Sequence, residues 1–509
     1  MKTSSTLADL LSLDSPSHAA VILPEDGAIT MRRGLAEQVE ALAARLRQTG
    51  LQPGQPVAIV LPNGLEYLVA FLAVARARLV AAPLNPAYKA DEFRFYLEDI
   101  GARAIIAPPG GHPVRDVARD LGLVVWDARL DGQGRATLEG EKAHGSQPVG
   151  LPEAPRPEDV ALFLHTSGTT SRPKGVPLTH GNLMTSIRNI ANHYRLTPED
   201  VGLVVMPLFH VHGLIGATLA PLFAGGTVVV PPRFSAGAFW PAARAHRVTW
   251  YSAAPTIHQI LLTRADADGA PAHPGFRFIR SCSAALAGVT LAGLESRFDA
   301  PVLEAYAMTE AAHQMTSNPL PPGTRKPGTV GRGTNVDVAI MDEAGNLLPG
   351  GAQGEVVVRG PNVTPGYHNN PTANAASFTN GWFRTGDRGV LDGDGYLTLI
   401  GRIKELINRG GEKISPLEVD AVLLAHPAVA EAATFGAPDA KYGEEVHAAV
   451  VLKGEATVEQ LQAHCQDRLA SFKVPKVIYL AKEMPRTATG KIQRRHVAAA
   501  FLQSATRRA

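Results

Sequence analysis

Residues 160–175 read VALFLHTSGTTSRPKG, an apolar run followed directly by hydroxyls, glycines and cations. The apolar half predicts a buried strand, whereas the loop after it is unsuited to a hydrophobic core. Its glycines allow close backbone approach, its hydroxyls and N–H groups donate hydrogen bonds, and Arg172 and Lys174 supply positive charge. A strand that feeds such a loop predicts a site for nucleotide phosphates.

The loop does not have the spacing of a Walker A motif. After Gly168 the lysine comes at the sixth position, and Gly175 follows it where that motif has serine or threonine. A flexible surface loop would account for the glycines and hydroxyls, but not for both cations. The sequence therefore predicts a phosphate site of another class.

Size and composition predict a globular protein with more than one domain. The chain has 509 residues, 45% of them hydrophobic and 19% charged, and a formal net charge of only +2. The charge balance argues against nucleic acid as a partner. Cys282 and Cys465 lie far apart, so they form no metal-spacing pair and indicate a reducing compartment.

The ends of the chain carry no recognisable address. The first nine residues lack the apolar core of a signal peptide, and the last residues do not spell Ser-Lys-Leu. No window has the apolar length of a membrane span. We expect a cytoplasmic protein with no membrane partner, and either a monomer or a homodimer.

Strand and helix patterns alternate through about residue 300. Val57–Leu61 and Ala104–Ala107 have the texture of strands, whereas Arg33–Gly50 and Leu65–Arg78 are alanine-rich and helix-like. This alternation predicts the α/β class, with helices layered on mostly parallel sheets.

The pattern changes near Lys326, where short strands are separated by Gly, Pro and Asn. Residues 326–401 are expected to form a small β-rich subdomain. A helix-and-strand pattern returns after Gly401. We therefore expect a large N-terminal domain at 1–401 and a smaller, mobile α/β lid domain at 402–509, joined by a hinge at 402–404.

Three further motifs contain residues that could bind a ligand or take part in catalysis, and each motif alone is weak evidence for such a role. Glu310, in Tyr306–Glu310, could hold Mg²⁺, although exposed Thr-Glu pairs are common. Asp387 lies in a glycine-flanked turn, where it could accept hydrogen bonds from ribose hydroxyls or stabilise its own turn. Lys491 follows Pro485 and Gly490 in a loop, where it is either a mobile cation or a solvated surface residue.

In this order and spacing, the four motifs resemble the adenylate-forming superfamily of acyl-CoA synthetases, aryl-CoA ligases, luciferases and adenylation domains. The resemblance covers about residues 10–500 and implies a lid that rotates between two half-reactions. A carboxylate first attacks the α-phosphate of ATP, giving an acyl-adenylate and pyrophosphate. A thiol, normally that of coenzyme A, then displaces AMP, so positioning and electrostatics dominate catalysis.

The resemblance also implies roles for individual residues. Those that would bind ATP are Thr166, Ser167, Gly168, Thr169, Thr170, Ser171, Lys174, Thr309, Asp387, Arg402 and Lys491. Among the catalytic residues, Thr309 would contact the α-phosphate, Glu310 would hold Mg²⁺ and Lys491 would stabilise charge as the adenylate forms. Gly411 and Lys473 match positions that contact coenzyme A, and Lys404 matches the hinge.

Two positions depart from the common pattern of the superfamily. Ser171 and Ala307 stand where many relatives have glycine. Each adds only a small side chain, so the backbone loses freedom but no catalytic group is lost.

The acid should bind among three sequence blocks that are rich in basic and hydroxyl side chains. The residues expected to bind it are His210, His212, Arg280, Ser281, Ser283 and His313. Such groups suit a second carboxylate, which an apolar tunnel would reject. Arg277 alternates with Arg280 along the same strand, and the alternation favours Arg280 as the inward residue. His313 could instead be a surface residue of a helix after Glu310.

The whole pattern resembles the oxalyl-CoA synthetases (oxalate–CoA ligases), which convert oxalate, ATP and CoA to oxalyl-CoA, AMP and pyrophosphate. A short, basic, hydroxyl-lined pocket is suited to this smallest dicarboxylate. Two alternatives stay open: a ligase for another short dicarboxylate such as malonate, and an adenylation domain that loads a carrier protein.

Overall fold

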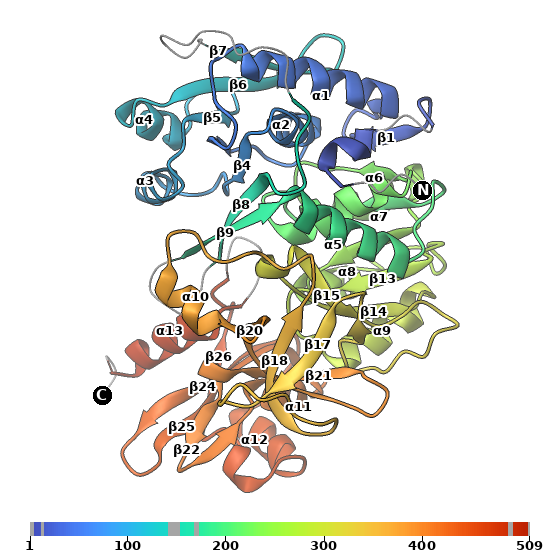
Figure 1. Cartoon of the computed structure of the whole chain (residues 1–509). Coiled ribbons are helices and arrows are strands. Elements are labelled where there is room, and N and C mark those ends of the chain that lie inside the picture. Colours follow the sequence, from blue (N-terminus) through green and yellow to red (C-terminus); the bar gives the residue numbers. More distant parts are fainter. Residues whose placement is uncertain (1–4, 12–14, 141–152, 167–172, 487–491, 507–509) are drawn as a thin grey trace.

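The computed structural model describes residues 5–11, 15–140, 153–166, 173–486 and 492–506 (Figure 1). It confirms the predicted α/β class, with helices packed on sheets along the N-terminal part of the chain.

The first sheet carries the strand that enters the phosphate loop. Its strands, in spatial order, are β7 (Ala136–Gly140), β6 (Val124–Leu130), β5 (Ala104–Ala107), β3 (Pro56–Ile59), β4 (Val80–Pro83), β8 (Val160–Thr166) and β9 (Lys174–Thr179). Strands β8 and β9 pair antiparallel, with Thr166 opposite Lys174, so both ends of the loop start from one point of the sheet edge. The strands of the sheet interior are buried and near-continuously apolar, as expected for parallel strands covered on both faces.

The second sheet carries the residues expected to bind the acid. Its spatial order is β16 (Arg332–Gly333), β15 (His313–Ser317), β14 (Val302–Met308), β13 (Phe278–Ser281), β12 (Trp250–Ala253), β10 (Val201–Leu203), β11 (Thr227–Val229), β1 (Ala19–Ile22) and β2 (Ile29–Met31). Strands β12, β13 and β14 run parallel, and a short 3₁₀ turn (Thr309–Ala311) returns the chain into antiparallel β15.

Helices cover these two sheets (Figure 1). They are α1 (Arg32–Arg47), α2 (Leu65–Arg76), α3 (Ala90–Asp99), α4 (Pro113–Asp120), α5 (His180–His193), α6 (Ala220–Phe223), α7 (Ala236–Ala245), α8 (Pro255–Thr263) and α9 (Gly288–Phe298). A π-helix, His212–Leu219, precedes α6 and is buried along its whole length. Helix α2 is apolar on nearly every side and joins the central core.

The third sheet is formed by β17 (Asp337–Met341), β18 (Gln353–Arg359), β20 (Trp382–Leu391), β19 (Phe378–Thr379) and β21 (Leu397–Arg402), with α10 (Pro371–Ser377) beside it. The fourth is formed by β23 (Glu412–Ile414), β22 (Ile407–Arg409), β25 (Gly443–Leu452), β24 (Val429–Asp439) and β26 (Val477–Ala481), with α11 (Pro416–Leu424), α12 (Val458–Gln466) and α13 (Arg494–Thr506). The short 3₁₀ segment Ile403–Glu405 connects them. The domain limits and the hinge at 402–404 stay predictions.

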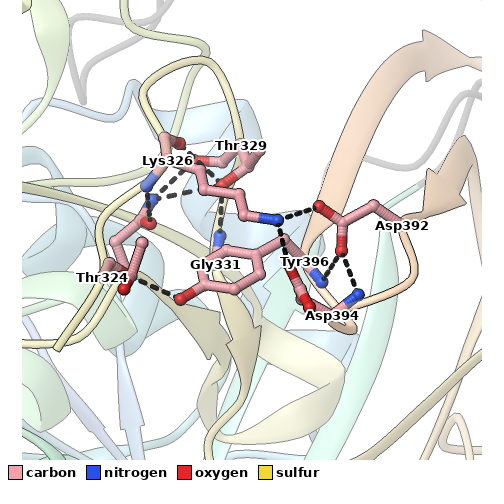
Figure 2. Close-up of polar contacts among 8 residues, drawn as sticks. Thr324, Lys326, Thr329, Gly331, Asp392, Asp394 and Tyr396 are labelled. Carbon is pink, nitrogen blue, oxygen red and sulfur yellow. Dashed lines mark hydrogen bonds and ion pairs between the residues drawn. The ribbon is translucent and has the colours of Figure 1, made fainter.

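A polar clip holds the turn between β20 and β21 (Figure 2). The Lys326 ammonium lies 2.5 Å from Asp392 and 2.7 Å from Asp394, and it covers the ring of Tyr396. The Tyr396 hydroxyl donates to the Thr324 carbonyl at 2.5 Å. The clip fixes the start of β21, the strand that ends at Arg402.

Candidate active site

The expected acid-binding residues gather at the carboxyl ends of β12 and β13. Ser252 of β12 lies beside Arg280 of β13 in parallel register, and Arg280 lies beside Leu303 of β14. Ligands of open α/β sheets bind at this end of the strands. The turn after β14 brings Thr309 and Glu310 to the same edge, so residues expected to bind the acid and residues expected to bind the nucleotide meet there.

Arg280 is fully buried, and its guanidinium donates hydrogen bonds to neutral groups. Nε donates to the Tyr194 hydroxyl at 2.9 Å, and Nη1 donates to Ser252 Oγ at 2.9 Å. Nη2 donates to His313 Nε2 at 2.9 Å and Gln314 Oε1 at 2.8 Å. Within the described residues, no carboxylate forms an ion pair with this guanidinium. A buried positive charge without a counter-charge is costly, so the site is suited to an anion.

Two histidines stack beside this guanidinium. The rings of His212 and His313 lie 5.3 Å apart at 25°. Because arginine can only donate, His313 Nε2 must accept and the ring is neutral. His313 lies in β15 and is 1% exposed, so the alternative of a surface helix residue is wrong. Gly216 makes this possible, because a Cβ there would lie 2.5 Å from His313 Nε2.

The remaining expected acid-binding residues surround this pair. His210 Nδ1 accepts from the backbone N–H of His212 at 3.2 Å, and Ser281 is buried at the end of β13. Ser283 is partly exposed and lies 2.9 Å from His212 Nδ1, with a left-handed φ of +81°. Strained backbone of this kind is concentrated at functional sites.

Arg277 has a different environment. Its guanidinium forms two hydrogen bonds of 2.9 Å with the buried carboxylate of Asp200, and it also donates to the Tyr194 carbonyl. The ion pair ties β13 to the turn before β10. The structure thus brings Arg280, and not Arg277, into the cluster.

Asp387 and Arg402, two of the residues expected to bind the nucleotide, face one another. They lie opposite each other in β20 and β21 and form an ion pair of 2.8 Å. The Tyr306 hydroxyl also donates to Asp387. Burial raises the pKa of Asp387, and the Arg402 guanidinium opposes that rise. A carboxylate held in this way is suited to accept hydrogen bonds from a sugar.

Glu310 and Lys174 meet at Tyr367. The Tyr367 hydroxyl donates to Glu310 Oε1 at 2.9 Å, and the Lys174 ammonium lies 3.9 Å above the ring centroid. Glu310 is 5% exposed. Burial lowers the pKa of Lys174, as do Lys404 and Arg402, whereas Glu310 raises it. Tyr367 therefore fixes the position of both a carboxylate and a cation.

Other expected site residues are placed as follows. Thr309 opens the 3₁₀ turn, and Thr166 ends β8. Gly411 is exposed in the turn between β22 and β23 with φ of +98°, and Lys473 binds Glu418 at 2.7 Å. Ser167, Gly168, Thr169, Thr170, Ser171 and Lys491 lie outside the described residues.

Several polar residues of the site were not predicted from the sequence, namely Tyr194, Ser252, Gln314 and Tyr367. Ser252 lies in β12 and Gln314 in β15, whereas Tyr194 directly follows α5 and Tyr367 lies in the segment between β18 and α10. None of them lies in a motif used for prediction. Only Gln314 had a signal, since it follows His313 directly. In the described part of the chain, no group of three or more His, Cys, Asp or Glu residues could hold a metal ion, and no helix could span a membrane.

The chain belongs to the AMP-binding enzyme family. The model of that family matches residues 14–368, and the model of the AMP-binding enzyme C-terminal domain matches residues 418–491.

Among its relatives is the oxalate–CoA ligase of Arabidopsis thaliana, 51% identical over 92% of this chain and 93% of that protein. The oxalate–CoA ligase of Saccharomyces cerevisiae is 47% identical over 96% of this chain and 95% of that protein. The crystal structure of ATP-bound MatB from Rhodopseudomonas palustris has a TM-score of 0.86. It is 32% identical and covers 98% of this chain and 99% of its own.

Proposed function

We propose that this protein activates oxalate with ATP and transfers it to coenzyme A. One carboxylate oxygen of oxalate attacks the α-phosphorus, pyrophosphate leaves, and oxalyl-adenylate forms. The thiol of coenzyme A then attacks the carbonyl carbon, loses its proton, and releases AMP with oxalyl-CoA. The names of the two relatives support this substrate, as does the chemistry of the cluster around Arg280.

The observation that carries the substrate class is the buried charge of Arg280. A guanidinium surrounded by neutral acceptors leaves the site with net positive charge. A dicarboxylate supplies the missing negative charge through the carboxylate that does not react. A fatty or aromatic acid would leave that charge uncompensated.

The nucleotide would bind along the opposite side of the site. Asp387 and Arg402 would hold the ribose, and Lys174 and Thr166 would contact the phosphates with the loop 167–172. Glu310 has one oxygen held by Tyr367, which leaves its other oxygen for a Mg²⁺ ion. One carboxylate with phosphate oxygens and water suits this ion, which would neutralise charge on the phosphates.

Coenzyme A would bind after rotation of residues 402–509 about a hinge at 402–404. Gly411 and Lys473 would then contact it, and Lys491 would serve the first half-reaction. Lys491→Ala should abolish adenylation from acid and ATP but spare thioester formation from supplied adenylate. Equal loss of both half-reactions would contradict that role.

A pyrophosphate-release assay across acids tests the proposal. Oxalate, malonate, acetate, a medium-chain fatty acid and a cinnamate are each supplied with ATP and Mg²⁺, with and without coenzyme A. We expect the highest kcat/KM with oxalate, and oxalyl-CoA only when coenzyme A is present. A malonate preference, or transfer to a carrier protein but not to coenzyme A, would contradict it.

A further inference from the structure

Arg280 is fully buried, whereas Ser283 is partly exposed, and a row of hydrogen bonds connects them. Arg280 Nη1 lies 2.9 Å from Ser252 Oγ, which lies 2.6 Å from His212 Nε2. His212 Nδ1 in turn lies 2.9 Å from Ser283 Oγ. Three elements supply the row: β12 and β13 place Ser252 beside Arg280, and the π-helix begins at His212.

The protons along this row have one arrangement that satisfies every group. Arginine only donates, so Ser252 Oγ accepts from Nη1. The single hydroxyl proton of Ser252 then needs an acceptor, and His212 Nε2 is the one contact of that hydroxyl left among the described residues. His212 is therefore neutral, with its proton on Nδ1, and donates to Ser283 Oγ.

We infer that Ser252 is a positioning residue for acid binding. Through Ser252 and then His212, the charge of Arg280 polarises the hydroxyl of Ser283. Every hydrogen bond of the row is donated in the direction away from the guanidinium, so each one polarises the next. Ser283 accepts from His212 and keeps its own proton for a carboxylate of the acid. The identity of that acid rests on the proposed function, whereas the donor direction of the hydrogen-bond row does not.

The arrangement explains why the positive charge need not be exposed. A guanidinium in contact with solvent would bind any passing anion and would be screened by salt. Behind Ser252 and His212, it acts on Ser283, a donor whose position is fixed by a strained backbone. Selection for a short acid with two carboxylates follows from that fixed donor.

The tautomer of His212 tests, without substrate, in which direction the hydrogen bonds of the row are donated. The side-chain nitrogens are observed by NMR in protein labelled with ¹⁵N-histidine, and His212→Gln identifies the signals. We expect Nδ1 protonated and Nε2 unprotonated in the unaltered protein. Ser252→Ala should shift the ring toward the other tautomer, whereas Ser186→Ala, which removes another buried hydroxyl, should not. A proton on Nε2 in the unaltered protein would overturn the inference.

Coupling between Ser252 and Ser283 tests whether the hydrogen-bond row acts on acid binding as one unit. Ser252→Ala and Ser283→Ala should each raise the KM for the acid about tenfold and leave the KM for ATP within twofold. Because both act through one donor, the double variant should also show about tenfold, and not the hundredfold of independent effects. Additive effects, or an acid KM unchanged by Ser252→Ala, would overturn the inference.

These measurements separate the inference from the proposed function. The acid KM is measured with whichever acid of the panel gives the highest kcat/KM, so the hydrogen-bond row is tested even if oxalate is not that acid. If Ser252→Ala does not fold, the tautomer of His212 in the unaltered protein still decides in which direction the hydrogen bonds are donated.

Discussion

Arg277 directly precedes the buried strand β13 and Arg280 lies within it, yet their surroundings are opposite. Arg277 has a side chain that is 36% exposed and a full carboxylate partner, because Asp200 is 3% exposed and accepts two of its hydrogen bonds. Arg280 has no exposed surface and donates to two aromatic-ring residues, a serine and a glutamine.

The difference distinguishes an arginine that is paired with a carboxylate of the protein from one that we propose to act on the substrate. The Arg277–Asp200 pair is electrically balanced within the protein, so it stabilises the join between β13 and β10. The charge of Arg280 has no such partner among the described residues, and we propose that a bound anion balances it. Removing Arg280 should therefore impair catalysis but not stability, whereas removing Arg277 should reduce stability and have little effect on catalysis.

The largest expected effect is on catalysis. Arg280→Gln keeps a hydrogen-bonding side chain but removes the charge, so we expect kcat/KM for the acid to fall about 10³-fold, equivalent to about 4 kcal/mol. Arg277→Gln should stay within about threefold of the unaltered protein. Initial rates of pyrophosphate release measure both, and equal losses would break the distinction.

The next effect is on stability, in the reverse order. Arg277→Gln leaves the buried Asp200 carboxylate unpaired, and we expect a loss of about 3 kcal/mol in the free energy of unfolding by urea. Arg280→Gln should cost nothing or stabilise, because it removes a buried, unbalanced charge.

An exposed ion pair provides the control for that measurement. Arg359 and Asp337 bind at 3.0 Å with side chains 53% and 62% exposed, so Arg359→Gln should cost at most about 1 kcal/mol. A destabilisation by Arg280→Gln as large as that by Arg277→Gln would mean that both arginines are structural.

The smallest effect concerns Glu304, a buried carboxylate on β14, the strand next to Arg280. It accepts from the Gly328 N–H at 3.1 Å, and within the described residues it has no ion pair. Burial raises the pKa of Glu304 to about 7, from 4.5. The folded state therefore favours the protonated acid, and Glu304 costs stability increasingly as the pH rises from about 4.5 to about 7.

Glu304→Gln removes this titration and keeps an acceptor for Gly328. Between pH 5.5 and 8, the stability of the unaltered protein relative to the variant should fall by about 2 kcal/mol. The exposed Glu343→Gln serves as control and should show no such slope. A constant difference across this range would show that Glu304 does not titrate there.

Much of the fold could be predicted because it depends on local patterns. The apolar runs and alanine-rich stretches mark the strands and helices of the α/β class, and the motifs around Glu310 and Asp387 are continuous in the chain. His313 was ambiguous because the turn before β15 depends on left-handed φ values at Ala312 and His313, +48° and +99°, which residue type does not indicate.

The remaining features depend on neighbours from distant segments. Ser252 is an ordinary strand serine until the parallel register places it beside Arg280. Tyr194 and Gln314 lie 120 residues apart and meet only through packing, at 2.9 Å. Strand alternation favoured Arg280 over Arg277, but the carboxylate that distinguishes them, Asp200, lies 77 residues before Arg277.

The central claim is that the charge of Arg280 selects a second carboxylate. The most direct test is the ratio of kcat/KM for oxalate to that for acetate, measured by pyrophosphate release with the unaltered protein and with Arg280→Gln. Both acids have two carbons, so the ratio isolates that carboxylate. We predict a ratio of about 10³ or more that falls to about tenfold or less in the variant. An unchanged ratio would contradict the account.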